Sequence, residues 1–223
     1  MIPAVVALAL VVLSGLYALY RFAFGRRIPR ATRAGKSRPF DRERTEAEEF
    51  FDACAFEDAW ITSEDGLRLH ARLLAAREGK PMLLLFHGYR SSARNDFSCS
   101  LRTYLRHGFG LLLVDQRAHG LSEGRCITLG VRERYDCLDW ARYVQERFRP
   151  PRMYLEGLSM GAATVLMAAG LDLPPSVSGI IADCGYTSAR AILRKVIGDF
   201  RLPVVPVYAL ARLAARLFGG FDP

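Results

Sequence analysis

The chain has 223 residues, 51% of them hydrophobic and 24% charged, which suits one globular domain with an additional segment. Its formal net charge is +8, but residues 1–40 contain no Asp or Glu and hold most of that excess. The remainder is nearly neutral and has no basic stripe interleaved with aromatic residues, so we expect no nucleic-acid partner. The five cysteines are widely spaced and include no C-x-x-C pair, which argues against a disulfide framework or a zinc site.

The N-terminus predicts a transmembrane anchor over residues 1–22. Residues 1–20 carry no charged side chain, and about twenty helical residues just cross the hydrocarbon core of a bilayer. Tyr17, Tyr20 and Phe22 stand at one end, where an aromatic belt is expected. A cleaved signal peptide is the alternative, but it calls for basic residues before the apolar run and a small-residue cleavage site after it, and neither is present.

A basic cluster in residues 21–38 follows the apolar run directly. By the positive-inside rule, this cluster predicts a single-pass membrane protein whose C-terminal part lies in the cytoplasm. Residues 23–58 are expected to form a basic and then mixed-charge linker with a short helix. Residues 59–223 are expected to form the folded domain.

From residue 60 onward, strand and helix patterns alternate. An antiparallel hairpin is predicted over residues 60–76, with a turn at Asp65-Gly66. Continuous apolar runs predict four buried strands, at residues 81–88, in the strand and loop of residues 109–120, at residues 151–159 and at residues 177–188. Helical spacing predicts helices over residues 97–108, 131–148 and 160–171, followed by a closing helical segment split at Pro203 and Pro206. Buried runs that alternate with helices indicate an α/β fold, with a mostly parallel sheet covered by helices on both faces.

The sequence Gly157-Leu158-Ser159-Met160-Gly161 stands between the third buried run and a helix rich in small residues. A G-x-S-x-G pattern in a strand–turn–helix context is typical of a nucleophile elbow. The sharp turn forces strained backbone angles on the serine, so its neighbours must lack a Cβ. We therefore predict Ser159 as a catalytic nucleophile, over the alternative of a serine that only caps the helix.

Two further motifs follow the first two buried strands. The loop His87-Gly88-Tyr89 predicts an oxyanion hole formed by the backbone N–H groups of Tyr89 and Met160, with His87 as a structural residue. The run of residues 115–122, DQRAHGLS, carries polar side chains that can bond one another and fix a loop near the site. We interpret this run as structural.

These motifs, HGY, DQRAHGLSEG and GLSMG, resemble the α/β-hydrolase superfamily in their order and spacing. The sequence is similar to membrane-anchored bacterial α/β-hydrolase-domain proteins and to the monoglyceride-lipase-like and serine-aminopeptidase-like branches. The resemblance covers roughly residues 60–223. It implies an acyl-transfer hydrolase that needs no metal or organic cofactor.

The resemblance also implies a catalytic acid and a histidine after the nucleophile, but all four histidines precede Ser159. We expect that the sequence is a C-terminally truncated form of a longer protein that lacks the last two strands. Two alternatives stay open: a degenerate, non-catalytic relative, or recruitment of His119 as the base, with Asp183 as the acid.

The sequence therefore predicts a serine hydrolase that cleaves an ester or related acyl bond through an acyl-Ser159 intermediate. The expected substrate is a small-molecule or lipid-like acyl compound. The closing segment can overhang the site as an apolar pocket wall, or serve only as packing, through Pro203, Pro206, Tyr208, Leu210, Leu213, Leu217 and Phe218. The alternative function is a membrane-tethered, non-catalytic interaction domain.

Overall fold

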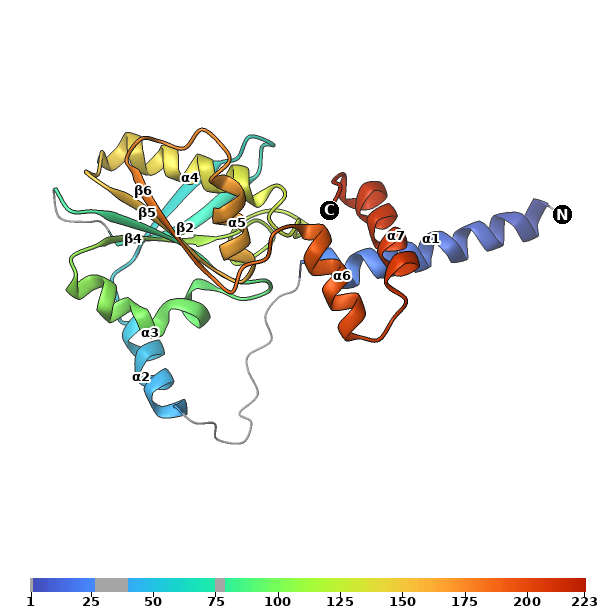
Figure 1. Ribbon diagram of the computed structural model, residues 1–223, viewed down its shortest axis with the longest axis horizontal. Helices are drawn as coiled ribbons and strands as arrows, with labels where there is room; N and C mark the ends of the chain where they lie inside the picture. Colours follow the sequence, from blue (N-terminus) through green and yellow to red (C-terminus); the bar gives the residue numbers. More distant parts are fainter. Residues whose placement is uncertain (1, 27–39, 75–78) are drawn as a thin grey trace.

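The computed structural model describes residues 2–26, 40–74 and 79–223 (Figure 1). Two helices precede the sheet: α1 (Ile2–Phe24) and α2 (Asp41–Asp52). Strands and helices then alternate through β1 (Glu57–Thr62), β2 (Arg68–Leu74), β3 (Met82–Phe86), α3 (Ala93–Arg106), β4 (Gly110–Asp115), α4 (Glu133–Phe148), β5 (Met153–Leu158), α5 (Met160–Ala168) and β6 (Val177–Asp183). The chain closes with α6 (Ala189–Asp199), α7 (Val204–Ala214) and a short π-helix, η1 (Ala215–Gly219).

Within the described residues, six strands form one sheet in the order β1-β2-β4-β3-β5-β6. The β1–β2 and β2–β4 pairs are antiparallel, and the other three pairs are parallel. This confirms the predicted opening hairpin and the mostly parallel sheet. Gly66 takes a φ of 83° in the hairpin turn, a backbone conformation that glycine adopts without steric cost.

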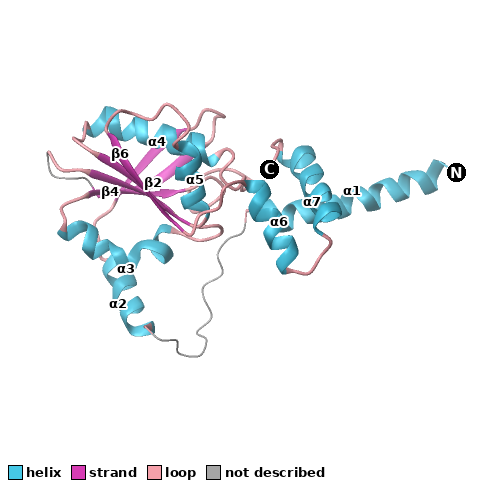
Figure 2. Cartoon of the chain, in the orientation of Figure 1, coloured by secondary structure: helices cyan, strands magenta, loops and turns pink. Residues whose placement is uncertain are grey.

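Helices cover both faces of the sheet, as the buried apolar runs predict (Figure 2). Successive side chains of a strand point to opposite faces. Leu84 of β3 therefore packs in a cluster with Trp140 of α4 and Val165 of α5. Its neighbour Leu85 packs in a separate cluster with Phe97 of α3. Each side of the sheet thus has its own hydrophobic core.

Two element boundaries differ from the sequence prediction. Helix α3 begins earlier than expected, at Ala93, because the Ser92 side chain accepts a hydrogen bond from the Asn95 N–H as an N-cap. Pro206 does not split the closing segment, because it lies in the first turn of α7, where a helix needs no backbone N–H donor. The break lies at residues 200–203 instead, so the prediction was right for Pro203 and wrong for Pro206.

Helix α1 is long and apolar enough to cross a membrane by length and composition. Its N-terminal half extends away from the sheet, while its C-terminal half lies beside α6 and α7 (Figure 1). Leu16, Tyr20 and Phe24 are buried there, and the Phe24 ring meets the Phe221 ring edge-on at a centroid distance of 5.3 Å. The end of α1 is therefore part of the folded unit.

The chain leaving α1 is also joined to the domain by backbone pairing. Gly25 forms an isolated antiparallel bridge with Cys126, and the Ile127 N–H donates a 2.7 Å hydrogen bond to the Phe24 carbonyl. The guanidinium of Arg26 donates to the carbonyl oxygens of Ser122 and Gly120. Residues 27–39, which hold most of the predicted basic linker, lie outside the described residues.

Candidate active site

The sheet topology brings the predicted motifs together at one edge. Strands β3 and β5 are adjacent, parallel and in register, with Phe86 opposite Gly157. From β3 the chain passes through α3 to β4, on one side of the pair. From β5 it passes through α5 to β6, on the other side. The pair β3–β5 is therefore a topological switch point. Ligand sites of open α/β sheets form at the carboxyl ends of such strands. The HGY loop and the GLSMG turn both lie at that point.

Ser159 occupies the sharp turn between β5 and α5. Its φ of 55° and ψ of −108° are unusual for a residue that carries a Cβ, and such a conformation costs on the order of 1–3 kcal/mol. The Ser159 N–H donates a 2.8 Å hydrogen bond to the Asp183 carbonyl at the end of β6, which helps hold the turn. The strained serine that the G-x-S-x-G pattern predicts is therefore present in the structure.

The glycines around Ser159 allow close backbone approach. A Cβ on Gly157 would overlap the Gly161 backbone, and a Cβ on Gly161 would overlap the Phe86 carbonyl. A Cβ on Gly88 would be 3.5 Å from the Cβ of Ser159, so the HGY loop lies directly against the serine. Strand β3, the turn and helix α5 can pack this tightly only because Gly157 and Gly161 lack side chains.

The two predicted oxyanion donors belong to the elements that flank Ser159. Met160 is the first residue of α5, a position whose N–H has no carbonyl partner within its own helix. Tyr89 follows Gly88 in the neighbouring loop. Asp96, in the first turn of α3, fixes that loop because its carboxylate accepts from the Gly88 N–H at 2.7 Å and from the Ser91 hydroxyl at 2.6 Å.

Sequence reasoning missed Asp96, although an acidic residue in the first turn of the helix after the loop was a usable signal. It also missed a buried amide bridge behind the loop. The Gln116 side chain donates to the His87 carbonyl and accepts a 3.0 Å hydrogen bond from the Thr164 hydroxyl. The bridge joins the ends of β3 and β4 to α5, and no pattern in the sequence indicated it.

The HGY loop is also bonded to the end of α1. The Tyr89 hydroxyl donates to the Ala23 carbonyl at 2.6 Å, and the Arg90 guanidinium donates to the Phe22 carbonyl at 2.6 Å and to the Gly25 carbonyl at 3.3 Å. The last carbonyls of a helix have no intrahelical partner, so these side chains cap α1. The predicted anchor and the predicted oxyanion loop are therefore in direct contact.

All four histidines lie among the described residues, and each is bonded to a group other than Ser159. His87 is buried, its Nδ1 contacts the Gly88 carbonyl, and its Nε2 accepts from the Gln116 N–H. His119 contacts the Arg117 carbonyl through Nδ1 and accepts from the Arg90 N–H through Nε2. Burial lowers the pKa of His87 and lowers that of His119 to about 3, so both rings are neutral.

The other two histidines are farther from the elbow in the fold. His70 of β2 lies between the carboxylates of Asp115, at 2.8 Å, and Asp58, at 3.0 Å. His107 ends α3 at the opposite edge of the sheet and contacts the Thr103 carbonyl.

Both ring nitrogens of His119 have backbone partners, which argues against its recruitment as a base. Asp183 lies beside the turn through its carbonyl and remains a candidate acid.

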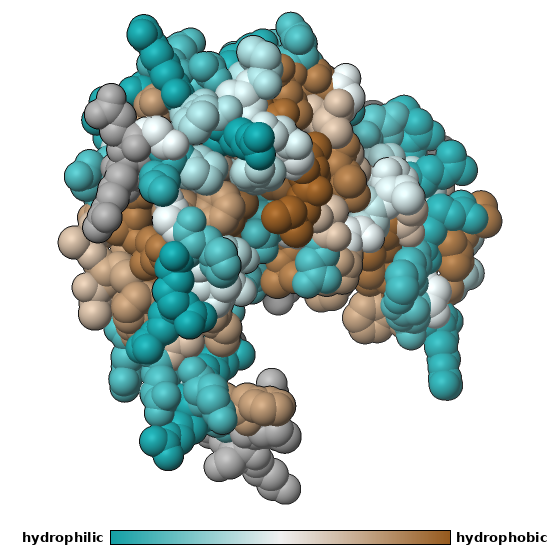
Figure 3. Space-filling model, turned by 60° about the vertical axis from the view of Figure 1, so that its left-hand side comes forward, coloured by the Kyte–Doolittle hydropathy of each residue, from teal (hydrophilic) through white to brown (hydrophobic). Residues whose placement is uncertain are grey.

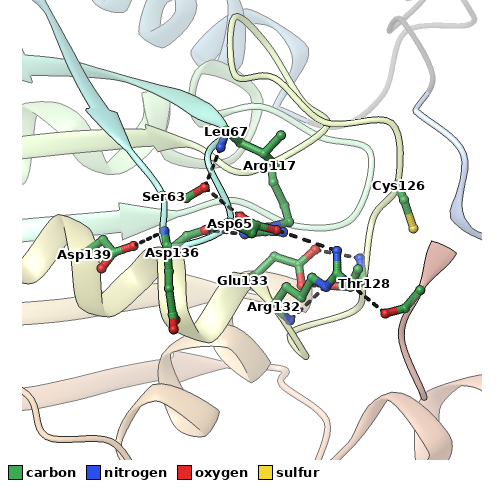
Figure 4. A network of polar contacts seen from close by, with 12 residues as sticks. Ser63, Asp65, Leu67, Arg117, Cys126, Thr128, Arg132, Glu133, Asp136 and Asp139 are labelled. Atoms are coloured by element: carbon green, nitrogen blue, oxygen red, sulfur yellow. Dashed lines mark hydrogen bonds and ion pairs between the residues drawn. The ribbon is translucent and has the colours of Figure 1, made fainter.

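Arg117 of the DQRAHGLS run belongs to a network of polar contacts (Figure 4). Arg117 donates two 2.6 Å hydrogen bonds to Asp136 of α4 and two more, at 2.8 and 3.1 Å, to Asp65 of the hairpin turn. Glu133 accepts from the backbone and hydroxyl of Thr128 and from the Gly130 N–H. The network ties the loop to α4 and to the hairpin, which agrees with the structural role predicted for this run.

A cavity of about 400 Å³ opens beside Ser159. Its polar lining consists of Ser159, Tyr89, Arg90 and Tyr186, and the rest is apolar. The apolar walls come from α1, from the loop before α4, from α6, and from the α6–α7 connection with α7. They are Leu19, Phe22, Ala23, Leu129, Ile192, Leu193, Val196, Ile197, Phe200, Leu202, Val207 and Ala211. A cavity of this size and character is typical of small-molecule sites.

The closing segment lines this cavity, but not through the predicted side chains. Leu210, Leu213 and Leu217 are exposed on the outer side of the segment, whereas Val207 and Ala211 face the cavity. The contribution of α1 was not predicted either, because a run of apolar residues looks the same whether it faces lipid or a cavity.

Comparisons with known proteins agree with this architecture. The chain is 22% identical to the Pyrococcus furiosus esterase Pf2001, with a TM-score of 0.59 over 83% of this chain and 67% of that one. It is 24% identical to the α/β-hydrolase GrgF from Penicillium sp. sh18, with a TM-score of 0.56 over 76% of this chain and 57% of that one. At such identities, these structures establish the fold.

In sequence, the chain is 24% identical over 163 residues to the uncharacterized protein YqkD of Bacillus subtilis. The match covers 72% of this chain and 53% of that protein, so the chain spans about half the length of this curated relative. A family model described as the alpha/beta hydrolase fold matches residues 81–202, more than half of the chain. The membership supports a hydrolytic function, and the chain belongs to the α/β-hydrolase family.

Proposed function

We propose that this protein is a serine hydrolase that cleaves an ester or related acyl bond through an acyl-Ser159 intermediate. The observation that carries the proposal is the position of Ser159: it is held at a positive φ in the elbow and lines a mostly apolar cavity of about 400 Å³. A strained, partly exposed serine at the start of a helix is suited to nucleophilic attack rather than to core packing.

In the proposed reaction, the Ser159 Oγ attacks the acyl carbonyl carbon and the carbonyl oxygen becomes an oxyanion. The N–H groups of Met160 and Tyr89 donate to that oxygen, and the positive end of the α5 dipole favours its charge. Collapse of the intermediate breaks the bond to the alcohol or amine, which leaves with the proton that the Ser159 hydroxyl gave up, and the acyl group stays on Ser159. Water then attacks the acyl-enzyme, which releases the acid and returns a proton to the Ser159 Oγ. Because the four histidines are bonded elsewhere, we assign the general base to none of them.

The lining of the cavity supports an apolar acyl group as the part of the substrate that it holds. Leu193 and Ile197 of α6 and Leu19 of α1 offer hydrocarbon contacts and no hydrogen bonds. The polar side chains lie near the loop and the elbow, where the carbonyl group would react. We therefore propose a substrate with a hydrophobic acyl chain and a polar or small leaving group.

We further propose that α1 anchors the protein in a membrane. Its length and composition support a span, and the burial of its C-terminal end against the domain argues against a cleaved signal. Cleavage after α1 would remove Tyr20 and Phe24 from a hydrophobic cluster that also contains Met160 and Phe221. The basic residues after the span support a cytoplasmic domain.

Covalent labelling of the full chain with a fluorophosphonate probe tests the nucleophile. We expect labelling of the wild type, its loss in Ser159→Ala, and its retention in Ser178→Ala, whose hydroxyl is exposed on β6 and donates to the Ser176 carbonyl. A mass-spectrometric adduct on Ser159 and hydrolysis of nitrophenyl acyl esters would complete the assignment. A folded wild type that takes up no probe would overturn the proposal.

A non-catalytic, membrane-tethered interaction domain is the second candidate. The partners of the histidines favour it, because both ring nitrogens of His87 and of His119 are bonded to the backbone. The same labelling experiment separates the two functions. Binding of a long-chain fatty acid without any probe labelling or ester hydrolysis would support this second function.

The orientation is tested separately by a reporter fused to the C-terminus. We expect a reporter that works only in the cytoplasm to be active, and one that works only outside the membrane to be silent. The reverse pattern would contradict the cytoplasmic placement but leave the assignment of Ser159 untouched.

A further inference from the structure

The exposed part of α1 is too short to cross a bilayer alone. Among the side chains of α1 that the structure describes, Leu16 is the first that is buried against the domain, and beyond it buried positions alternate with exposed ones such as Tyr17. Residues 2–15 form about 21 Å of helix at roughly 1.5 Å per residue. A hydrocarbon core is about 30 Å thick. A span by α1 must therefore include the turns from Leu16 to about Arg21, which are packed against the domain.

Those same turns contact η1 at the end of α7. The Phe218 ring lies 5.3 Å from the Tyr17 ring and 5.8 Å from the Tyr20 ring, measured between centroids. A bilayer that surrounds α1 to the depth of Tyr20 would also surround whatever packs beside it. Helix α7 and η1, residues 204–219, lie at that depth.

The outer surface of α7 and η1 suits such an environment. Leu210, Leu213 and Leu217 recur at helical spacing and are 48%, 44% and 57% exposed. The opposite side packs inward through Ala211, Ala214 and Ala215, small residues that allow close approach to α1. The lobe at the right of the space-filling view carries hydrophobic patches between hydrophilic ones (Figure 3).

The charged residues of this segment are also arranged for a medium of low polarity. Arg212 and Arg216 are the two charged residues of α7 and η1, and both donate to the Asp222 carboxylate. A paired arginine costs less to place at a membrane boundary than an unpaired one.

From these observations we propose that α7 and η1 form a second membrane-inserted element, embedded in the same leaflet as the C-terminal turns of α1. The occupant of their exposed apolar surface is the acyl-chain region of that leaflet. Because Leu19 and Phe22 of α1 and Val207 of α7 wall the cavity beside Ser159, this part of its wall then lies at the membrane. This last step rests on the proposed function and makes the substrate a membrane-resident amphiphile.

The test is carbene labelling of the full chain in phosphatidylcholine vesicles with a hydrophobic diazirine that partitions into the acyl region. After photolysis, adducts are mapped by mass spectrometry. We expect adducts in residues 6–20 and, at comparable yield, in residues 204–218. Leu166 of α5 is the matched control, because its 48% exposure equals that of Leu210 and it lies on the sheet domain. Its peptide sets the background level.

Labelling of residues 6–20 with residues 204–218 at the background level would overturn the inference and leave the anchor intact. Absence of labelling in both segments would overturn the inference together with the membrane anchor. Neither outcome affects the reaction of Ser159 with a fluorophosphonate, so failure of this inference is distinguishable from failure of the proposed hydrolase.

Discussion

The backbone N–H of Ser159 donates a 2.8 Å hydrogen bond to the carbonyl oxygen of Asp183, which joins the elbow to the end of β6. The pairing of Leu158 with Asp183 continues the β5–β6 ladder up to the serine. The positive φ of Ser159 is thus held from one side by the sheet and from the other by the close packing of Gly157 and Gly161. This arrangement makes the elbow sensitive to small changes in its neighbours.

Gly161→Ala should disrupt the elbow, because the new methyl group would overlap the Phe86 carbonyl. We expect a loss of about 1–3 kcal/mol in the free energy of unfolding and a marked fall in fluorophosphonate labelling. Gly170→Ala is the matched control, since its Cβ would meet only the Met167 carbonyl oxygen, at 3.7 Å. Equal labelling and stability of the two variants would contradict this account.

Much of the fold could be predicted because strand and helix patterns are local. The glycines of the elbow, the buried runs and the hairpin turn each leave a signature within a few residues. The bonds that hold the HGY loop could not be predicted in the same way. Asp96, Gln116 and the end of α1 reach the loop from three separate elements, and their contacts depend on the order of strands in the sheet.

The helix break expected at Pro206 was wrong for a related reason. A proline interrupts a helix only if it lies beyond the first turn. Its effect could therefore be predicted only if the first residue of the helix was known, and that residue follows Pro203. The role of α1 in the cavity was also hidden, since hydropathy does not distinguish an exposed apolar residue such as Val11 from a cavity-wall residue such as Leu19.

Arg117→Ala should destabilise the domain strongly. The Arg117 and Asp136 side chains are each only 4% exposed, and removal of the guanidinium leaves a buried carboxylate without its partner. We expect a loss of about 3–5 kcal/mol, measured by chemical unfolding in detergent micelles. Arg42→Ala removes an exposed pair with Glu46 and should change stability by about 0.5 kcal/mol or less. Similar unfolding midpoints for the two variants would show that the network carries little energy.

Phe24→Ala tests whether the end of α1 is part of the fold. Phe24 is fully buried against Phe221, so its truncation should cost about 3–5 kcal/mol of unfolding free energy. Phe22→Ala is the neighbouring control, because Phe22 is 60% exposed. A Phe24 variant as stable as the Phe22 variant would mean that α1 contributes nothing to the domain.

The stabilisation from His70 should depend on pH. Burial opposes protonation of His70, but the carboxylates of Asp115 and Asp58 outweigh it and raise its pKa above the ordinary value of 6.5. A histidine with a raised pKa in the folded state stabilises the protein fully below its unfolded pKa, and this stabilisation is lost as the pH rises through the folded pKa.

Asp58→Asn should therefore lower the free energy of unfolding more at about pH 5.5 than at about pH 9. Asp199→Asn, which removes an exposed partner of Lys195, should show no such difference between the two pH values. A penalty for Asp58→Asn that is equal at both pH values would refute the assignment of charge to His70.

Ile192→Trp should narrow the cavity, because Ile192 is a partly buried residue of α6 on the cavity wall. If the protein hydrolyses acyl esters as proposed, the preferred acyl chain should become shorter in a series of nitrophenyl esters. Ile181→Trp on β6 lies outside the cavity and should leave the preference unchanged. An identical chain-length profile in both variants would place the acyl group elsewhere.

The backbone bridge between Gly25 and Cys126 joins the end of α1 directly to the domain. A catalytic domain on a flexible linker can reach substrates over a wide area of the membrane and also in the aqueous phase. If α1 spans a membrane as proposed, the bridge and the bonds of Arg90 to the end of α1 set the height and tilt of Ser159 relative to the lipid plane. Encounters with substrate would then follow two-dimensional diffusion in the leaflet, and turnover would scale with the surface density of substrate rather than with its bulk concentration.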